Sequence, residues 1–215
     1  TLGLVLILAF SGLGVLSLIL AGWGSNNKWG LLGAARSVAQ SVAYEVPLLL
    51  SVMAVALTAG SLDLYEITSQ QGGWPWQWYG VQNPLAFFIF LVCAGAETNR
   101  APFDLPEAES ELTAGFHTEY SGMGFGLFFL AEYANMVVVC GVATALFLGG
   151  WQGPFLSGIL WFLVKVYAIL LLMIWMRWTY PRVRFDQLLN LSWKWLTPLA
   201  IIDLALVVII KGIGG

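Results

Sequence analysis

Long apolar runs, separated by polar or turn-rich segments, dominate the pattern of this sequence. A helix needs about 20 apolar residues to cross the hydrocarbon core of a bilayer, and most of the runs reach that length. The pattern therefore predicts an all-α, polytopic membrane protein with about six transmembrane helices, forming a single transmembrane domain over residues 1–215. The predicted spans are residues 2–21, 38–60, 84–101, 123–148, 158–178 and 196–211.

The third of these runs is the shortest. Only the stretch from Pro84 to Ala96 is wholly apolar, and Glu97 follows it directly. Proline is well suited to the first turn of a helix, so Pro84 marks the start of this span. A helix long enough to cross the membrane from there would carry Glu97 and Arg100 inside the inner membrane face.

The composition agrees with a membrane protein. The chain is 59% hydrophobic and 10% charged, and its mean hydropathy is +0.81, far from the values of a soluble domain. The net charge of −3 gives no reason to expect a nucleic-acid partner or an acidic substrate. Cys93 and Cys140 lie in apolar runs and the chain has one histidine, so we expect no metal site, no disulfide and no iron–sulfur ligation.

Basic residues predict the orientation of the spans. The loops at 22–37, 97–122 and 177–195 lie on one side, whereas the loops at 61–83 and 149–157 lie on the other and contain no Lys or Arg. By the positive-inside rule the first set faces the cytoplasm or the mitochondrial matrix, and both termini are outside. An outer aromatic belt is expected at Trp74, Trp76, Trp78 and Tyr79.

Ionisable residues lie well inside four of the predicted spans, at Glu45, Glu132, Lys165 and Asp203. A charge at the bilayer centre costs at least about 2.5–3.5 kcal/mol, so such residues usually face a bundle interior and mark an ion or substrate path. Glu45 is expected roughly 10 Å and Glu132 roughly 14 Å from the inner end of its span. The structural alternatives are a protonated glutamate bonded to a backbone carbonyl loosened by Pro47, and a Lys165–Asp203 pair that joins two helices.

Half of the 12 acidic residues lie in one connecting segment, "AETNRAPFDLPEAESELTAGFHTEY" at 96–120. Crowded, partly buried carboxylates hold and release protons near neutral pH, which a proton path requires. Pro102 and Pro106 stiffen the segment, and Phe103 and Leu105 are expected to pack inward. A solvated acidic loop and an anchoring surface for a soluble partner are the alternatives. The six acids are Glu97, Asp104, Glu107, Glu109, Glu111 and Glu119.

This segment and its continuation, "SGMGFGLFFLAEYANM", resemble the signature of the quinone-site membrane subunit of respiratory complex I, called subunit 1 in mitochondria and the H-type subunit in bacteria. The resemblance extends through "GWGSNNKWGLLGAARSVAQSVAYEVPL", "FLGGWQGP" and "RWTYPRVRFDQLLNLSWKWLTPL", and it covers nearly the whole chain, in order. Membrane-bound hydrogenase-type complexes and ferredoxin-dependent relatives contain similar subunits and are the alternative assignment.

The resemblance implies a subunit of a proton-translocating NADH:quinone oxidoreductase in a mitochondrial inner or bacterial cytoplasmic membrane. Such a subunit contains no redox centre of its own: quinone is the substrate, and NADH, FMN and iron–sulfur clusters are bound by other subunits. The sequence contains no GxGxxG or Walker pattern, which agrees with NADH binding elsewhere. The implied partners are membrane lipids, other membrane subunits, and soluble iron–sulfur and quinone-site subunits on the inner side.

The resemblance also assigns individual residues. The proton path would comprise Glu45, Glu97, Glu107, Glu109, Glu111 and Glu132. The quinone cavity would be lined by Phe129, Arg36, Arg100, Arg177, Arg182 and Arg184. It assigns no role to His117, which we expect at the surface.

One departure from the family concerns the start of the chain. Family members begin with a transmembrane helix, an amphipathic helix and a second transmembrane helix, which have no counterpart here. We therefore expect this chain to be the C-terminal two-thirds of the usual subunit, either as a partial sequence or with a separate chain supplying the first helices. A secondary transporter is disfavoured because the halves show no inverted repeat, and a purely structural anchor would leave Glu45 and Glu132 unexplained.

Overall fold

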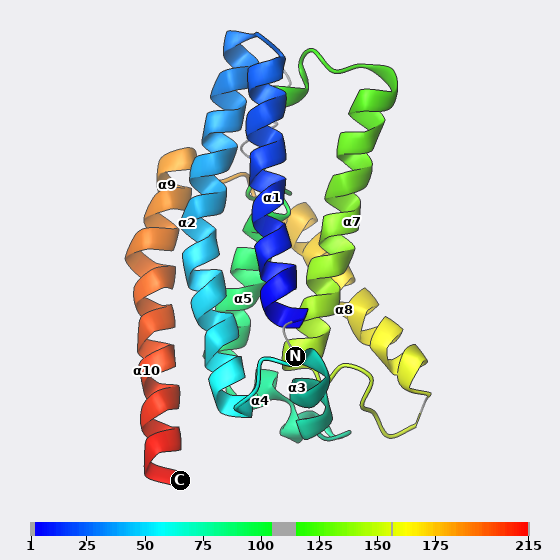
Figure 1. Cartoon of the computed structure of the whole chain (residues 1–215), viewed down its shortest axis with the longest axis vertical. Coiled ribbons are helices and arrows are strands. Elements are labelled where there is room, and N and C mark those ends of the chain that lie inside the picture. Colours follow the sequence, from blue (N-terminus) through cyan, green and yellow to red (C-terminus); the bar gives the residue numbers. More distant parts are fainter. Residues whose placement is uncertain (1–2, 105–114, 156, 215) are drawn as a thin grey trace.

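The computed structural model describes residues 3–104, 115–155 and 157–214, and the regular elements within these ranges are helices. Figure 1 shows them as an elongated bundle, with the α1–α2 turn at one end and α3 and α4 at the other. Both chain termini lie toward the α3–α4 end (Figure 1). The long elements are α1 (Gly3–Gly24), α2 (Lys28–Ala59), α5 (Pro84–Glu97), α7 (Gly122–Phe147), α8 (Gly158–Thr179) and α10 (Thr197–Gly214).

The all-α, polytopic class predicted from the sequence is confirmed. Among the described residues, five helical stretches are long and apolar enough to cross a membrane, and α5 is a shorter apolar helix of 14 residues. The five stretches are Gly3–Gly24, Lys28–Ala59, Gly122–Phe147, Gly158–Thr179 and Phe185–Gly212.

The end of α5 differs from the predicted span. The helix starts as expected, with Pro84 in its first turn and the Asn83 side chain accepting from the Ala86 amide. It ends at Glu97, because Asn99 has a left-handed backbone with φ of 50°. Arg100 therefore lies in the connection beyond the helix and not within a transmembrane helix.

The predicted inner loop at 22–37 is also wrong. The connection between α1 and α2 covers only residues 25–27, and the Asn27 side chain caps α2 by accepting from the Trp29 amide. Glu45 consequently lies 17 residues after the first residue of α2, Lys28, so it is deeper in its helix than the sequence indicated. Pro47 does not interrupt α2, which continues to Ala59 with the proline ring buried.

Small residues allow α1 and α2 to approach closely near their connection. A Cβ atom on Gly22 would lie 2.3 Å from the Cβ of Ala34 and 2.9 Å from the carbonyl oxygen of Gly30. Real side chains do not come so close, so the contact requires glycine at position 22. Close backbone approach at small residues is a common way for helices to pack in a membrane.

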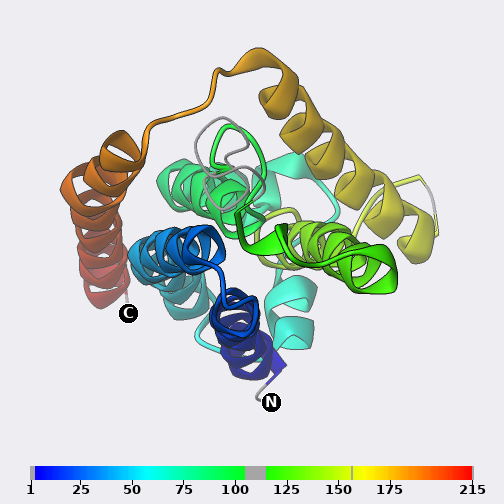
Figure 2. The ribbon, with the colours of Figure 1, turned by 90° about the horizontal axis from the view of Figure 1, so that it is seen from above.

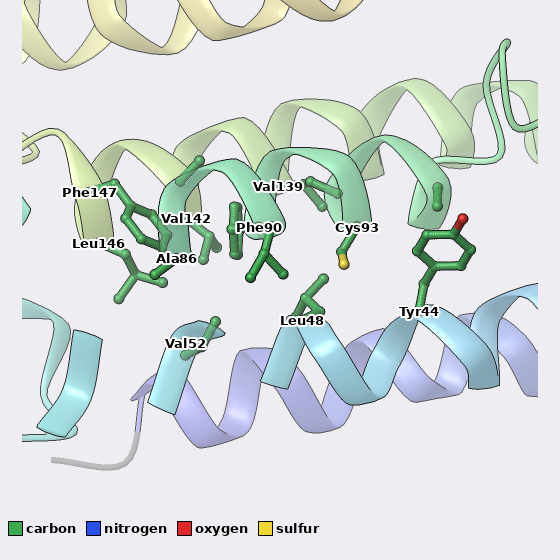
Figure 3. Packing of buried hydrophobic residues seen from close by; sticks show 14 of the residues in the cluster. Tyr44, Leu48, Val52, Ala86, Phe90, Cys93, Val139, Val142, Leu146 and Phe147 are labelled. Atoms are coloured by element: carbon green, nitrogen blue, oxygen red, sulfur yellow. The ribbon is translucent and has the colours of Figure 1, made fainter. Parts of the chain in front are cut away.

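The core lies between α2, α5 and α7. Figure 3 shows Leu48 of α2, Phe90 and Cys93 of α5 and Val139 of α7 directed toward one another. The rings of Phe90 and Phe147 are 5.2 Å apart, within the range of favourable aromatic packing. α10 packs on α2 and α8 packs on α7, and Figure 2 shows these two outer helices on different sides of the bundle.

The chain between α8 and α10 returns to the core through a tethered connection. Its extended part is held at residue 183, whose amide donates to the Pro102 carbonyl at 3.1 Å, and at Arg182, which pairs with Asp104 at 2.8 Å. It continues as α9 (Phe185–Asn190) and a π-helical turn, η3 (Leu191–Leu196), which joins α10. The hydroxyl groups of Tyr44 and Ser192 anchor this part to the core: Tyr44 donates to Leu188 at 3.1 Å, and Ser192 donates to a carbonyl of α2.

The end of the bundle that the predicted topology places outside is closed by α3 (Leu64–Gln70), a 3₁₀ turn, η1 (Pro75–Gln77), and α4 (Tyr79–Gln82). The Gln71 amide donates to the carbonyls of Ala145 and Leu146 at 3.2 and 3.0 Å and thereby covers the end of α7. Trp74 and Trp76 are exposed, as a membrane-interface belt would have them, whereas Tyr79 is buried. Burial raises the pKa of Tyr79.

The alternative of a Lys165–Asp203 pair is wrong. The Lys165 ammonium donates to the carbonyls of Leu148, Gly150 and Gln152 at 2.6, 3.1 and 2.7 Å. It also lies 4.4 Å from the ring centroid of Trp78, so cation–π attraction adds to the three hydrogen bonds. Asp203 accepts from the Asn83 amide at 3.1 Å and joins α10 to the start of α5.

Candidate functional site

A cavity with both apolar and polar lining residues lies between α1, α2, α5 and α7, and it is partly open to the surface of the bundle. Its volume is about 280 Å³, and it is lined by three glutamates from three different helices. Glu45 comes from the middle of α2, Glu97 from the last turn of α5, and Glu132 from α7. We call this the acid cavity.

The remaining wall of the acid cavity combines small, polar and apolar groups. α1 contributes small residues, including Ser11 and Gly12, which leave space in front of the carboxylates. Ser11, Glu45 and Glu97 line the same cavity, and the Ser11 hydroxyl donates to the Leu8 carbonyl at 2.8 Å. Further polar lining groups are Ser41, Asn99 and Asn135, and the apolar ones include Leu8, Phe10, Leu48, Leu49 and Phe128.

Glu132, which lines the acid cavity, is paired with a cation. The Arg100 Nη2 atom lies 3.0 Å from Glu132 Oε2, and only 9% and 14% of the two side chains are exposed. The guanidinium carbon also lies 4.4 Å from the ring centroid of Tyr133 and 5.2 Å from that of Phe129. The two ring faces and the carboxylate together hold the guanidinium against α7.

The predicted surface position of His117 is wrong. Its side chain is 4% exposed, and its Nε2 atom lies 4.0 Å from Glu132 Oε1. The short 3₁₀ turn η2 (Gly115–His117) directs the imidazole against α7, where the edges of Phe125 and Phe128 pack on it at centroid distances of 5.4 and 5.5 Å. Glu132 thus has Arg100 near one carboxylate oxygen and His117 near the other.

A buried glutamine fixes the connection that carries Arg100. The Gln40 side-chain nitrogen donates to the carbonyls of Ala96 and Phe103 at 2.7 and 2.9 Å and lies 3.3 Å from Asn99 Oδ1. Ala96 is at the end of α5, where the last carbonyls have no partner within the helix. Gln40 therefore joins this helix end to the segment that follows it.

An apolar cavity of about 250 Å³ adjoins the acid cavity. The two share polar and apolar lining residues: Ser11, Glu97 and Asn135, together with Leu8, Phe10 and Leu48. The rest of its wall is apolar and includes Leu6, Ile7, Phe90, Val138, Val139 and Val142.

The structure gathers some of the residues that the resemblance selected and separates others. Glu45, Glu97 and Glu132 line one cavity, and Arg100 contacts it. Glu107, Glu109 and Glu111 lie outside the described residues. Arg36 is partly buried on α2, Arg182 pairs with Asp104, and Arg177 and Arg184 are exposed. Phe128 lines the acid cavity, while Phe129 packs beside Arg100.

Several polar residues of the site were not identified from the sequence. Asn135 lies three residues after Glu132, and Ser41 lies four before Glu45, so both share a helix face with a glutamate. That spacing could have identified them. His117 and Gln40 carry no such signal, because they reach the site through a connection whose path the sequence pattern does not specify.

The arrangement is suited to holding and moving protons. The acid cavity has room for several water molecules, each of which occupies about 30 Å³ in the liquid. Carboxylates that converge from three helices can exchange protons through such water. Among residues 3–104, 115–155 and 157–214, no group of three or more His, Cys, Asp or Glu residues is placed to hold a metal ion.

Comparisons with known proteins agree with this architecture. A family model described as NADH dehydrogenase matches residues 1–208. The H-type NADH-quinone oxidoreductase subunit of Desulfotalea psychrophila is 51% identical over 216 residues, covering 95% of this chain and 65% of the relative. The second H-type subunit of Koribacter versatilis is 53% identical over 215 residues, covering 94% of this chain and 61% of the relative.

The same name recurs at similar identity. The second H-type NADH-quinone oxidoreductase subunit of Geobacter metallireducens is 50% identical over 209 residues, covering 97% of this chain and 60% of that relative. The chain thus spans less than two thirds of the length of these curated relatives. Since the family model covers nearly the whole sequence, the chain belongs to the NADH dehydrogenase family.

Proposed function

We propose that this chain is a membrane subunit of a proton-translocating NADH:quinone oxidoreductase and that its acid cavity transfers protons in response to quinone reduction. The observation that carries the proposal is the convergence of Glu45, Glu97 and Glu132 on one cavity inside an apolar bundle. Ionisable groups are expensive at such a depth, and three of them would not be retained at one place for packing alone. The names of the relatives favour this function over that of a hydrogenase-type subunit.

Coupling needs a connection between the redox site and the acid cavity. Reduction of a quinone takes up protons and changes the charge beside nearby titratable groups. Arg100 is placed to transmit that change, because its guanidinium pairs with Glu132 and belongs to the inner-side connection after α5. The acids Glu107, Glu109 and Glu111 of the same connection would form the inner mouth of the path. The basic residues Arg36, Arg177, Arg182 and Arg184 would lie on that side as well.

The proposal assigns quinone as the substrate and places every redox group elsewhere. The apolar cavity next to the acid cavity offers hydrocarbon surface of the kind that accepts part of an isoprenoid tail. NADH, FMN and iron–sulfur clusters would be bound by soluble subunits on the inner side. Other membrane subunits would continue the proton path, and a further segment or chain would complete the bundle in an energy-converting membrane, bacterial or mitochondrial.

The test replaces Glu132 by glutamine in the assembled complex. Glu132→Gln keeps the size and hydrogen bonding of the side chain but removes the proton that it could carry. General acid–base groups contribute about 10²–10⁴-fold to rates, so we expect quinone reduction by NADH to fall at least about tenfold. Proton translocation should fall with it, because a blocked proton route stalls a tightly coupled redox step.

Asp203→Asn is the matched control. Asp203 is also a buried carboxylate of a membrane-spanning helix, but it bonds Asn83 at 3.1 Å and does not line the acid cavity. An asparagine can still accept that hydrogen bond, so the variant should retain both activities. Normal quinone reduction and proton translocation in assembled Glu132→Gln would overturn the proposal.

A further inference from the structure

We propose that His117 is a proton-relay residue that exchanges a proton with Glu132, as an addition to the proposed function on which it rests. The imidazole Nε2 atom is 4.0 Å from Glu132 Oε1, whereas the other carboxylate oxygen of Glu132 is 3.0 Å from Arg100 Nη2. The Glu132 carboxylate therefore has two different neighbours. The Arg100 guanidinium cannot release its proton, whereas the His117 imidazole can.

The surroundings of His117 support a functional role for its imidazole. The side chain is 4% exposed, and the edges of Phe125 and Phe128 cover it. An imidazole in such an apolar enclosure exchanges protons with the polar groups that it faces directly. Among the described residues, Glu132 is the carboxylate that faces it, and Arg100 is the cation next to that carboxylate.

The position of His117 along the chain fits a relay. It belongs to η2, at the end of the inner-side connection, while Glu132 lies ten residues after Gly122, the first residue of α7. Glu119 and Thr118, next in the chain, are exposed. A proton that passes from His117 to Glu132 therefore moves from the inner side toward the acid cavity.

The step conserves charge and atoms. The Nε2–H bond of a protonated His117 breaks, and an O–H bond forms at Glu132 Oε1, directly after a small approach or through one water molecule. The imidazolium becomes a neutral imidazole, and the carboxylate becomes a carboxylic acid. Arg100 then loses its anionic partner but keeps the faces of Tyr133 and Phe129, 4.4 and 5.2 Å from its guanidinium carbon.

The test uses two replacements that can form hydrogen bonds but cannot carry a proton, His117→Gln and His117→Asn, in the assembled complex. We expect quinone reduction to fall at least about tenfold, within the range of general acid–base contributions. The shape of the dependence of the rate on pH should change, because neither glutamine nor asparagine can take up and release a proton at this position. A packing role alone would lower the rate without altering the shape of that profile.

Glu119→Gln is the matched control, because it removes a titratable group two residues away. Its side chain faces Asn27, whose amide donates to Glu119 Oε1 at 2.9 Å, and glutamine can still accept that bond. The control should keep the rate and the pH profile of the unaltered complex.

The outcomes separate the relay from the proposed function. A loss in Glu132→Gln together with an unchanged rate and pH profile in both His117 variants would overturn the relay and leave the proposed function standing. A complex in which neither variant assembles would assign His117 to packing and also overturn the relay. Unchanged activity in Glu132→Gln would instead remove the proposed function itself.

Discussion

The side-chain nitrogen of Gln40 lies 2.9 Å from the carbonyl oxygen of Phe103, although the two residues are 63 positions apart in the chain. This bond and the one to the Ala96 carbonyl hold the connection after α5 against α2. Arg100 lies between the two acceptors, so the position of its guanidinium beside Glu132 depends on a residue that touches neither group.

We expect Gln40→Leu to destabilise the protein by about 1–3 kcal/mol, because the buried Phe103 carbonyl loses its side-chain donor and the Ala96 carbonyl is left with the Asn99 amide, at 3.3 Å. The midpoint of thermal unfolding in detergent would measure the change. Gln82→Leu is the control, since Gln82 is exposed and its 3.4 Å bond to the Gln77 carbonyl is open to water. If both substitutions lowered the unfolding midpoint equally, burial of the Gln40 hydrogen bonds would contribute nothing to stability.

The Arg100–Glu132 pair should behave as a coupled unit. Removing one partner of a buried pair leaves an uncompensated charge, so Arg100→Met should lower the free energy of unfolding by about 3 kcal/mol. Adding Glu132→Gln should restore part of that loss, with a coupling free energy of about 0.5–3 kcal/mol. Denaturation of the two single variants and the double variant would measure it, and strictly additive effects would contradict the pairing.

The contact between α1 and α2 should not tolerate a methyl group at position 22. We expect Gly22→Ala to cost about 1–3 kcal/mol, the range for overpacked sites, since its Cβ would lie 2.3 Å from that of Ala34. Gly14→Ala on the same helix has nothing within 4 Å and should be neutral or slightly stabilising. Thermal unfolding of both variants provides the comparison, and similar stabilities would rule out the close approach.

The ammonium of Lys165 should stabilise the outer end of the bundle. Lys165→Met leaves three backbone carbonyls without their donor, so we expect a loss of about 1–3 kcal/mol. Lys211→Met removes a similar bond, to the Leu57 carbonyl at 2.6 Å, at an exposed site where water can replace it. That change should stay within about 0.5 kcal/mol. Unfolding midpoints that rank the two variants in the opposite order would contradict this account.

The orientation in the membrane can be tested with single cysteines. Ser69 lies in α3 and Thr118 follows η2, and both are exposed at opposite ends of the bundle. Ser69→Cys should react with a membrane-impermeant maleimide from outside intact cells, and Thr118→Cys only from inside. Cys93 and Cys140 are buried, so background labelling should be low. Labelling of both positions from one face would refute the predicted topology.

The sequence predicted the fold class well because apolar runs of transmembrane length leave few alternatives. It also selected Glu45, Glu97 and Glu132, since ionisable residues within apolar runs are conspicuous. It did not predict that α2 starts at Lys28, because the polar residues before the apolar run were assigned to a loop. Nor did it place His117, because that depends on how the connection folds back onto α7.

The shortness of α5 has an electrical consequence. Its 14 residues rise about 21 Å, against a hydrocarbon core of about 30 Å, so α5 leaves about 9 Å of the core uncovered. With Pro84 at the outer boundary, as the predicted topology has it, Glu97 would lie that distance from the inner boundary. A proton that reaches Glu97 from the inner side has then crossed about a third of the transmembrane field. Moving a unit charge through the whole field takes about 2.3 kcal/mol per 100 mV, so this entry step takes only about 0.7 kcal/mol. Loading of the acid cavity would respond weakly to membrane potential, and most of the voltage dependence would fall on the steps beyond Glu97.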